Sequence, residues 1–449
     1  MVALSIRLKK FDKPESFKYH RWMPQNIPHR MAFGLYNLLW SCVLPWLRMN
    51  HRLAEGYDQR RLKSLPPAAD IWIQAASVGE SYLALEIIKR LEAGRPVKIL
   101  VTSNTSQGVD ILNRERLQLK QTGEGMAVAV GYFPFDKPSL MKKAVSVIRP
   151  AVLVLLETEI WPGLLQALKQ QHCKTLIVNG RITAISLKRY LLWPSIWPPI
   201  RPDRILAVSS ADADRFKQMF GPEAVETMPN IKFDRVAASI PSTKNRNPLK
   251  GLIPDSLIFT VLASVRRQEE PRVKQVINTI LDRRPQTVIG LFPRHMHRIK
   301  YWQEVLSRAG IQWKLRSDAR DPVTAGTVIL WDAFGELQQA YELCRAAFIG
   351  GSLVPLGGQN FLEAMICGIK PVMGPSWENF LWVGTEIIGS GLLKIAENWQ
   401  AAAELLIKDM DHPPPKGEII GRSLAYIKNR CGGTARACHA IIDLLAARE

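Results

Sequence analysis

The sequence predicts an α/β protein of two domains, each built on a parallel sheet with helices on both faces. Three observations carry this prediction. The chain has 449 residues, whereas single domains cluster near ~100–200 residues. Short apolar runs alternate with longer segments of helical periodicity, and this alternation stops once and then resumes. With 47% hydrophobic and 22% charged residues, the chain can form two sizeable cores.

The first run of alternating elements begins after Pro66 and Pro67. Ile71–Ala75 is short and apolar like a strand, and apolar residues at helical spacing follow Ser77. Several of the strands that we expect are apolar almost throughout, which is typical of a parallel sheet covered on both faces. The further strands of this run are Val97–Thr102, Ala151–Leu156, Thr175–Val178 and Ile205–Val208.

The alternation is interrupted between Asp234 and Asp255, where polar residues and prolines replace it. Strands then resume at Leu257–Leu262, Thr287–Phe292, Thr327–Leu330 and Ala347–Ile349. We therefore expect five parts of the chain: an extension without an assigned role (1–30), a membrane-associated segment (31–65), a first domain (66–235), a linker (236–255) and a second domain (256–449).

The membrane-associated segment is expected because Met31–Leu47 is apolar, contains two tryptophans and is flanked by Arg30 and Arg48. The run is at the short end of the ~17–25 residues that span a bilayer, and Asn37 and Pro45 also argue against spanning. Trp and Arg side chains suit the headgroup region, so the sequence favours a helix that lies in the membrane surface. The alternative is a buried core helix.

A second segment, Lys188–Arg204, combines aromatic, proline and basic residues, and it suits a lipid-facing surface and a proline-broken loop equally. The formal net charge of +20 favours anionic partners. Nucleic acid is disfavoured because no nucleic-acid-binding motif occurs. Six cysteines without paired spacing indicate a reducing compartment.

Polar residues follow several of the predicted strands. In open parallel sheets, ligands bind beyond the carboxyl ends of the strands. A glycine-rich stretch also leads into a predicted helix, where glycines let the backbone approach a phosphate and the helix N-terminus stabilises its charge. These segments are Ser77–Glu80, Glu157–Glu159, Pro293–His295 and Gly350–Gly358, the last of which precedes Asn360 and Glu363.

A series of different short motifs extends through most of the chain. The ordered set is far more specific than any one of them. They are Ala76-Ser77-Val78-Gly79-Glu80, Thr102-Ser103-Asn104-Thr105-Ser106-Gln107-Gly108, Glu157-Thr158-Glu159-Ile160-Trp161-Pro162, Asn230-Ile231-Lys232-Phe233-Asp234, Pro293-Arg294-His295, Gly335-Glu336-Leu337, Phe348-Ile349-Gly350-Gly351-Ser352-Leu353, Gly358-Gln359-Asn360-Phe361-Leu362-Glu363-Ala364 and Met373-Gly374-Pro375. With these motifs the chain resembles the 3-deoxy-D-manno-octulosonic acid (Kdo) transferase family.

The resemblance implies a GT-B fold, in which two Rossmann-like domains face a central cleft, with an N-terminal membrane-associated helix. It implies an acceptor-binding first domain and a CMP-Kdo-binding second domain. The implied enzyme is an inverting, metal-independent glycosyltransferase without a cofactor. It transfers Kdo from CMP-Kdo to a tetraacylated, phosphorylated lipid A precursor in lipopolysaccharide core biosynthesis. The expected location is the cytoplasmic face of the inner membrane, at an anionic membrane surface and with no nucleic-acid partner.

The resemblance also implies roles for single residues. Glu80 corresponds to the catalytic base, and Glu157 and Lys232 assist the transition state. Donor contacts are implied for Pro293, Arg294, Phe334, Gly335, Glu336, Asn360, Phe361, Leu362 and Glu363.

Each role has a structural alternative. Glu80 also suits a helix start, where a carboxylate complements the dipole. Glu157 follows a buried strand and also suits a structural ion pair with a cation. Lys232 and Arg294 have the alternative of being solvated surface residues. Asn360 and Glu363 also suit an N-cap and its N3 partner, and both roles are compatible.

Two further patterns are discounted as metal sites. Asp212-Ala213-Asp214 spells the DxD pattern of metal-dependent glycosyltransferases, but its position favours helix capping. His295 and His297 lack companion ligands. We expect no metal.

The sequence departs from the family near the implied donor site, at Gln359, Pro229 and Val265-Arg266-Arg267. These departures leave open a glycosyltransferase of the same fold that uses another nucleotide sugar. The non-enzymatic alternative is a basic protein that binds membranes or nucleic acid.

Overall fold

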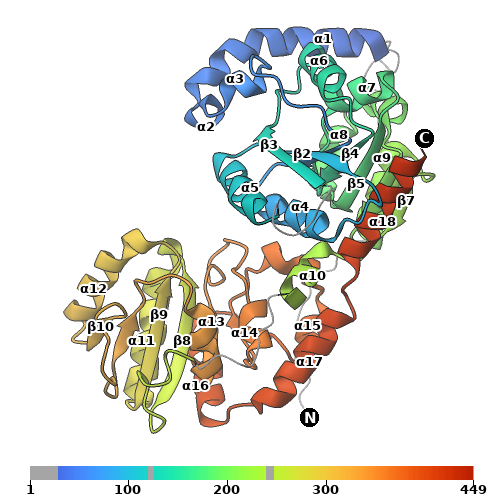
Figure 1. Ribbon diagram of the computed structural model, residues 1–449. Helices are drawn as coiled ribbons and strands as arrows, with labels where there is room; N and C mark the ends of the chain where they lie inside the picture. Colours follow the sequence, from blue (N-terminus) through green and yellow to red (C-terminus); the bar gives the residue numbers. More distant parts are fainter. Residues whose placement is uncertain (1–28, 120–125, 239–246, 448–449) are drawn as a thin grey trace.

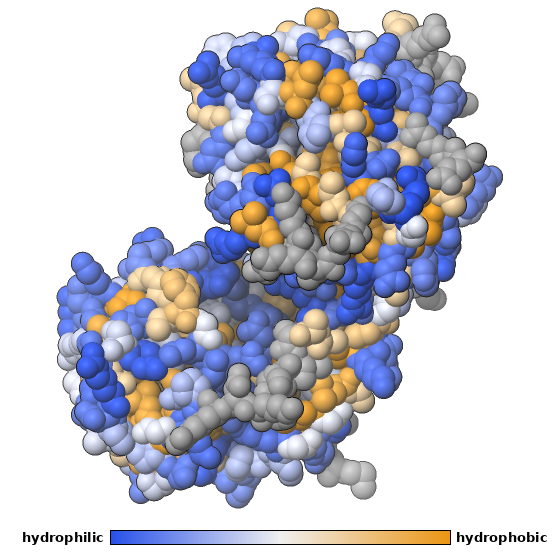
Figure 2. All heavy atoms as spheres, in the orientation of Figure 1, coloured by the Kyte–Doolittle hydropathy of each residue, from blue (hydrophilic) through white to orange (hydrophobic). Residues whose placement is uncertain are grey.

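Two seven-stranded parallel sheets form the two domains of the computed structural model, which describes residues 29–119, 126–238 and 247–447 (Figure 1). Residues 1–28 of the expected extension (1–30) and the middle of the expected linker, at 239–246, lie outside the described residues. In the space-filling view, the molecule is narrowest between the two domains (Figure 2).

The first sheet has the strand order β3-β2-β1-β4-β5-β6-β7. Its strands are β1 (Ile71–Ala75), β2 (Val97–Ser103), β3 (Met126–Tyr132), β4 (Val152–Leu156), β5 (Lys174–Gly180), β6 (Arg204–Ala207) and β7 (Val225–Thr227). The helices of this domain are α4 (Val78–Arg90), α5 (Ser106–Leu119), α6 (Pro138–Ile148), α7 (Pro162–Gln170), α8 (Ala184–Tyr190) and α9 (Ser210–Phe220). Separate apolar clusters pack on the two faces of the sheet, because β1 and β4 are buried throughout.

The second sheet has the order β10-β11-β9-β8-β12-β13-β14. Its strands are β8 (Ile258–Val265), β9 (Thr287–Pro293), β10 (Trp313–Leu315), β11 (Val328–Leu330), β12 (Ala346–Ile349), β13 (Val372–Met373) and β14 (Lys394–Ile395). Its helices are α11 (Glu270–Arg283), α12 (Ile299–Arg308), α13 (Leu337–Leu343), α14 (Leu362–Ile366), α15 (Glu386–Gly389), α16 (Trp399–Asp411) and α17 (Lys416–Lys428).

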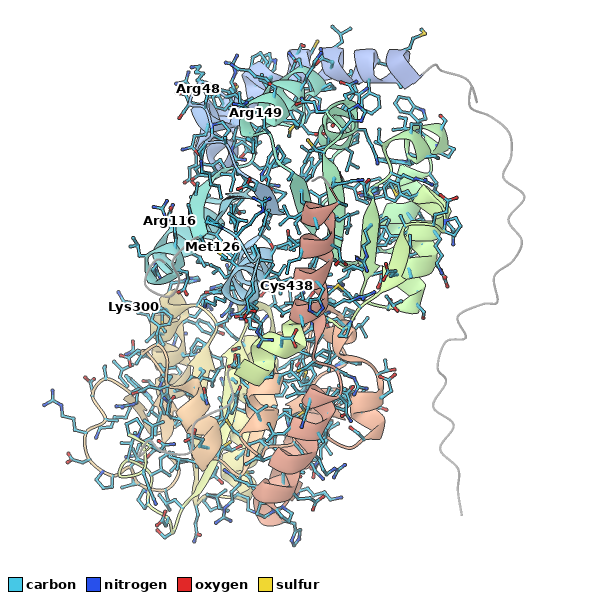
Figure 3. The ribbon with its side chains drawn as sticks, turned by 45° about the vertical axis from the view of Figure 1, so that its right-hand side comes forward. Arg48, Arg116, Met126, Arg149, Lys300 and Cys438 are labelled. Carbon is cyan, nitrogen blue, oxygen red and sulfur yellow. The ribbon has the colours of Figure 1, made fainter. Side chains whose placement is uncertain are left out.

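Helix α18 (Gly433–Ala446) returns from the second domain to the first, where it packs against α4, β4 and β5 (Figures 1 and 3). Cys438 lies on this helix, and its thiol donates a hydrogen bond to the carbonyl oxygen of Ile87. The N-terminus of α18 is fixed by Asp234, which accepts hydrogen bonds from the backbone N–H groups of Gly432 and Thr434. The last helix of the expected second domain thus belongs structurally to the first sheet.

The predicted membrane-associated segment begins as α1 (His29–Val43) and continues as η1 (Leu44–Met49), α2 (His51–Ala54) and α3 (Tyr57–Arg60). Tyr36 on α1 donates a hydrogen bond to Asp136, which is buried. Within the described ranges, no helix combines the length and the apolar character needed to cross a bilayer.

The segment after α8 contains two short 3₁₀ helices, η2 (Pro194–Ile196) and η3 (Pro198–Ile200). Trp197 and Ile200 are buried in the core of the first domain, whereas Leu192 and Trp193 are exposed. The segment is therefore a proline-broken connection with an exposed apolar edge.

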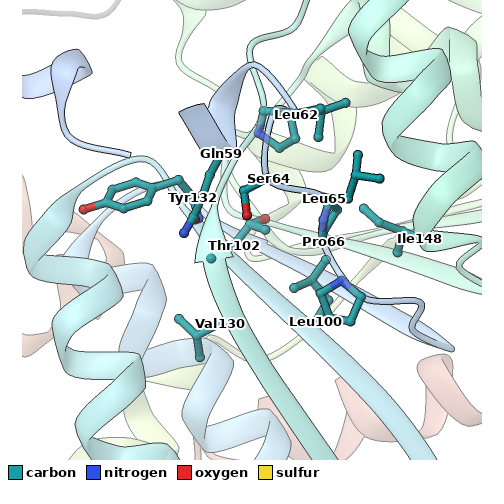
Figure 4. Close-up of a pocket in the computed structure, with 13 residues that line it drawn as sticks. Gln59, Leu62, Ser64, Leu65, Pro66, Leu100, Thr102, Val130, Tyr132 and Ile148 are labelled. Atoms are coloured by element: carbon teal, nitrogen blue, oxygen red, sulfur yellow. The ribbon is translucent and has the colours of Figure 1, made fainter. Parts of the chain in front are cut away.

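A small cavity of about 100 Å³ lies between α3 and the edge of the first sheet (Figure 4). Its wall includes Gln59 and Tyr132, and the side-chain oxygen of Gln59 accepts a hydrogen bond from the backbone N–H of Tyr132. Ligand pockets usually enclose ~300–1,000 Å³. This cavity is too small for a sugar nucleotide.

Candidate active site

The strand order reverses between β1 and β4 in the first sheet and between β8 and β12 in the second. Ligands of doubly wound sheets bind at such reversals, beyond the carboxyl ends of the strands. Glu80 follows β1 and Glu157 follows β4. In the second sheet, Arg266 follows β8 and Gly350 follows β12. The two implied catalytic carboxylates therefore lie at the reversal in the first sheet.

Glu80 lies in the first turn of α4, where its carboxylate accepts hydrogen bonds from the backbone N–H of Ala76 (2.7 Å) and the hydroxyl of Ser77 (2.9 Å). Ser77 in turn accepts from the backbone N–H of Glu80 (3.4 Å), so it is the N-cap of α4. Burial, together with the nearby carboxylates Glu159 and Glu157, raises the pKa of Glu80 to about 7. The structural alternative therefore holds, and it leaves Glu80 able to exchange a proton near neutral pH.

Glu157 and Lys232 form an ion pair with 2.6 Å between Oε1 and Nζ. Both side chains are largely withdrawn from solvent, with 18% and 26% exposed, respectively. Glu157 has a φ of 54°, which is unusual for a residue with a side chain. Such backbone strain persists where the surroundings fix it, often at functional sites.

Asn179, at the end of β5, was not singled out by the sequence analysis. It is fully buried and also has a positive φ of 56°. Its side-chain N–H donates to Glu157 (3.4 Å), and its side-chain oxygen accepts from the backbone N–H of Ile231 (3.0 Å). Asn179 thus connects the two segments that carry Glu157 and Lys232.

Glu159 belongs to one of the polar segments that follow the strands, but the resemblance implies no role for it. Its carboxylate accepts hydrogen bonds from the indole N–H of Trp161 (2.6 Å) and from the Gln74 side chain. Burial raises the pKa of Glu159 despite these hydrogen bonds. Gln74 also accepts from Thr102 and donates to Asn104, so the motif that begins at Thr102 supports this carboxylate.

Helix α10 (Ile231–Ala238) bridges the two domains. Ile231 belongs to an apolar cluster of the first domain and Phe233 to one of the second. Lys232 lies between them in the sequence, and its ammonium is 5.7 Å from the centre of the Trp382 ring of the second domain. The position of this lysine therefore depends on both domains.

A cavity of about 360 Å³ lies between the domains, and it brings together four of the residues predicted from the sequence, namely Lys232, Asn360, Leu362 and Glu363. Gly79 and Leu83 of α4 line it from the first domain. Lys232 lines it from α10, and Asn360 and Glu363 line it from the second domain. Its volume lies within the ~300–1,000 Å³ range of ligand pockets.

Asn360 and Glu363 are joined by a hydrogen bond of 2.8 Å between the amide and the carboxylate. Asn360 also accepts from the backbone N–H of Leu362 (3.1 Å), and it lies one residue before Phe361, which is the N-cap of α14. Phe361 and Leu362 are buried in the apolar core. Leu362 nevertheless lines the cavity, whereas Phe361 does not.

The glycine-rich stretch is occupied by a carboxylate of the protein. Glu269 is fully buried and accepts hydrogen bonds from the backbone N–H groups of Gly351, Ser352 and Leu353. A Cβ at Gly350 would lie 2.7 Å from a carboxylate oxygen of Glu269, which explains the glycine there. The prediction that this stretch binds a phosphate through its backbone is therefore wrong for these three N–H groups, because they bind Glu269.

The other implied donor residues lie around β9 and β11. Pro293 is buried, and Arg294 and Phe334 are exposed. Gly335 has a φ of 86°. The Glu336 carboxylate accepts two hydrogen bonds of 2.8 Å from Arg316. These residues do not line the cavity that holds Asn360 and Glu363.

The patterns discounted as metal sites have structural roles or no ligand geometry. Ser209 accepts from the backbone N–H of Asp212 at the start of α9, which confirms that Asp212 belongs to a helix cap. His295 and His297 stack with ring centres 5.5 Å apart. Among the described residues, no three His, Cys, Asp or Glu side chains are grouped as a metal ion requires.

The chain is similar in sequence to known proteins. Residues 48–235 match the family described as 3-Deoxy-D-manno-octulosonic-acid transferase (kdotransferase). The chain is 28% identical over 436 residues to the 3-deoxy-D-manno-octulosonic acid transferase of Bordetella pertussis, covering 92% of this chain and 100% of the relative. It is 28% identical over 374 residues to that of Haemophilus influenzae, covering 81% and 85%.

Solved structures share the two-domain arrangement. A glycosyltransferase from Rickettsia africae superposes with a TM-score of 0.55 and 12% identity, covering 84% of this chain and 98% of that one. The UDP-GlcNAc 2-epimerase of Neisseria meningitidis superposes with a TM-score of 0.52 and 10% identity, covering 84% and 99%. At such identities the likeness concerns the GT-B fold alone. The chain thus contains a domain that matches the Kdo transferase family model, and over most of its length it aligns with glycosyltransferases that are named as Kdo transferases.

Proposed function

We propose that this enzyme transfers Kdo from CMP-Kdo to a tetraacylated, phosphorylated lipid A precursor, with inversion and without a metal ion, in lipopolysaccharide core biosynthesis. One observation carries the proposal: Glu80, with a pKa of about 7, opens a helix whose start lines an interdomain cavity with Lys232. The relatives named as Kdo transferases support the choice of donor sugar.

Glu80 is the general base of the proposed reaction. It takes the proton of the acceptor hydroxyl while that oxygen attacks the Kdo anomeric carbon and the CMP phosphate leaves from the opposite face. A base with a pKa near the working pH both accepts and releases a proton readily. Lys232 places positive charge at the cavity wall, where it stabilises negative charge that develops on the departing phosphate.

We further propose that the enzyme is a monotopic protein on the cytoplasmic face of the inner membrane. One face of α1 is buried against the first domain through Ala32 and Phe33. The opposite face and the following turn expose large apolar side chains, namely Met31, Leu35, Leu38, Leu39, Val43, Trp46 and Met49. Arg48 and Arg149 lie exposed at this end of the domain (Figure 3). An apolar row with basic neighbours suits an anionic lipid surface.

An apolar cavity of about 400 Å³ next to α1 supports a lipid acceptor. Its wall combines Phe33 of α1 with Tyr190, Trp193 and Trp197. Pro162 also lines it and lies only three residues after Glu159, so the cavity adjoins the loop that carries the carboxylates. An acyl chain buried there would gain roughly 0.8 kcal/mol for each methylene removed from water.

The experiment that tests this function combines the protein in detergent with CMP-Kdo and the tetraacylated precursor, and measures the product mass. We expect a mass increase of one or more Kdo residues, unchanged by EDTA. UDP-sugars in place of CMP-Kdo test the alternative donors. Folded protein that uses a UDP-sugar and not CMP-Kdo would contradict the proposed donor, and loss of transfer in EDTA would contradict the metal-free mechanism.

A further inference from the structure

A second interdomain cavity, of about 890 Å³, lies on the other side of α10. It extends beyond the carboxyl ends of strands β4 to β7, which places it at the ligand-binding edge of the first sheet. Asn230 and Phe233 line this cavity, whereas Lys232 and Val236 line the cavity described above. Trp382 lines both cavities, so they are neighbours.

Three arginines line this second cavity: Arg181, Arg215 and Arg430. Arg215 is paired with Asp212, with 3.3 Å between Nη1 and Oδ1. Arg430 donates to the carbonyl oxygen of Tyr426 and stacks on its ring at 3.6 Å, but it contacts no carboxylate among the described residues. Arg181 follows β5, and within the same described ranges its guanidinium has no ion pair.

The carboxylates of the lining do not cancel these cations. Asp212 is used by Arg215 and by the backbone N–H of Ile182, from which it accepts a hydrogen bond of 3.0 Å. Glu386, the other carboxylate, is exposed at the rim. The guanidinium groups of Arg181 and Arg430 thus remain without an ion pair among the described residues, and the only lining carboxylate left to balance their charge is the exposed Glu386. A guanidinium binds phosphate through paired hydrogen bonds, which makes such a wall suited to a phosphate ester.

A buried donor in the cavity wall supports an anionic ligand. Asn230 is only 5% exposed, and its side-chain Nδ2 has no hydrogen-bond partner among the described residues. Its Oδ1 already accepts from the backbone N–H of Lys232 (3.0 Å). A buried donor left unpaired costs ~1–3 kcal/mol, so an acceptor oxygen from a ligand would relieve this cost.

The cavity also adjoins the catalytic loop. Thr158 lies between Glu157 and Glu159 in the sequence and lines the cavity. Its hydroxyl donates to the carbonyl oxygen of Arg181 (2.6 Å). An anion bound at Arg181 is therefore linked through one residue to the carboxylates of the proposed reaction.

We propose that Arg181, Arg430 and Asn230 bind a phosphate ester on the acceptor sugar and so position its hydroxyl for attack. This inference rests on the proposed function and adds a specificity site to it. The donor's phosphate belongs to the cavity that holds Lys232, so the two substrates depend on different arginine and lysine side chains.

The test compares the phosphorylated acceptor with the same acceptor after phosphatase treatment, for wild type and for Arg181→Ala and Arg430→Ala. We expect wild type to prefer the phosphorylated acceptor. In each variant the KM for the phosphorylated acceptor should rise roughly ten- to hundred-fold, because hydrogen bonds to charged groups are of this strength. The KM for CMP-Kdo should not change. Arg181→Lys should recover part of the loss, since it keeps the charge and loses the fork. Arg308→Ala, an exposed arginine on α12, is the matched control.

The inference would be overturned if both alanine variants still preferred the phosphorylated acceptor as strongly as wild type does. It would also be overturned if only the KM for CMP-Kdo rose. Neither result would contradict Kdo transfer itself. A wild type without transfer activity contradicts the proposed function instead. In that case, calorimetric titration with glucosamine 1-phosphate and with glucosamine still tests whether the second cavity binds a phosphate ester. Equal affinity for the two sugars, or binding that survives Arg181→Ala and Arg430→Ala, would contradict it.

Discussion

Lys232 Nζ lies 2.6 Å from Glu157 Oε1, and this ion pair joins the helix between the domains to the end of a strand in the first. The pair is held from both sides, since Asn179 contacts Glu157 and the Trp382 ring lies near Lys232. Lys232 also lines the interdomain cavity. The position of its positive charge in the proposed active site therefore depends on how the two domains pack together.

Lys232→Met is expected to reduce activity strongly and to lower the free energy of unfolding by ~1–3 kcal/mol, because it leaves the Glu157 carboxylate largely buried without its cation. The double variant Lys232→Met/Glu157→Gln should regain part of that stability without regaining activity. Urea unfolding and the transfer assay measure the two effects. A double variant less stable than Lys232→Met would show that the ion pair is not the cause.

The pH dependence of kcat/KM should report Glu80. Its pKa is raised to about 7, and the proposed base is active when ionised, so activity should be lost as the pH falls through about 7. Glu159→Gln removes the largest electrostatic cause of the raised pKa, which is second to burial, and should move this midpoint to lower pH. A midpoint that stays in place in Glu159→Gln would rule out this electrostatic account.

Tyr36→Phe should lower the free energy of unfolding by ~1–3 kcal/mol, because the hydroxyl donates to the buried Asp136. Asp136 also accepts from the backbone N–H groups of Gly163 and Leu164, so it ties α1 to the start of α7. Tyr301→Phe is the control, since that hydroxyl has no hydrogen bond among the described residues. Equal stability losses in the two variants would mean that the contact with Asp136 contributes nothing.

Gly163→Ala should be destabilising as well, because a Cβ there would lie 2.6 Å from the backbone oxygen of Asp136. The same denaturation measurement tests it. Gly417→Ala is a control, since a Cβ at that helical glycine meets no atom within 4 Å.

Charges on the exposed row of α1 should weaken membrane binding. Leu35→Glu/Leu38→Glu is expected to reduce sedimentation with vesicles of anionic lipid by about ten-fold or more, since each leucine loses its apolar contact with lipid. Leu117→Glu changes an equally exposed leucine on α5 and should have no effect. If all variants bind vesicles alike, α1 is not the contact surface.

The sequence predicts the buried strands well and the short edge strands poorly. β1 begins and ends where expected, because its five residues are all buried and all but Gln74 are apolar. β13 and β14 have two residues each, too few for a periodic pattern. The return of α18 to the first domain depends on the contact of Asp234 with Thr434, and no local pattern reveals a contact across 200 residues.

The candidate site shows the same division. Motifs were enough to single out Glu80, Glu157 and Lys232, and the fold brings them together. The roles of Glu159 and Asn179 were missed because they arise from tertiary hydrogen bonds. Likewise, the glycine-rich stretch matched a phosphate loop, and only its contact with Glu269 reveals a structural purpose.

Single-turnover transfer by Glu80→Gln tests the central claim most directly, with CMP binding measured on the same protein by calorimetry. Glutamine keeps the size and can still accept a hydrogen bond from Ala76, but it cannot take a proton. We predict that Kdo transfer falls by ~10²–10⁴-fold, the usual contribution of a general base, while CMP affinity stays at the wild-type value. Transfer at the wild-type rate would contradict the assignment of Glu80 as the base.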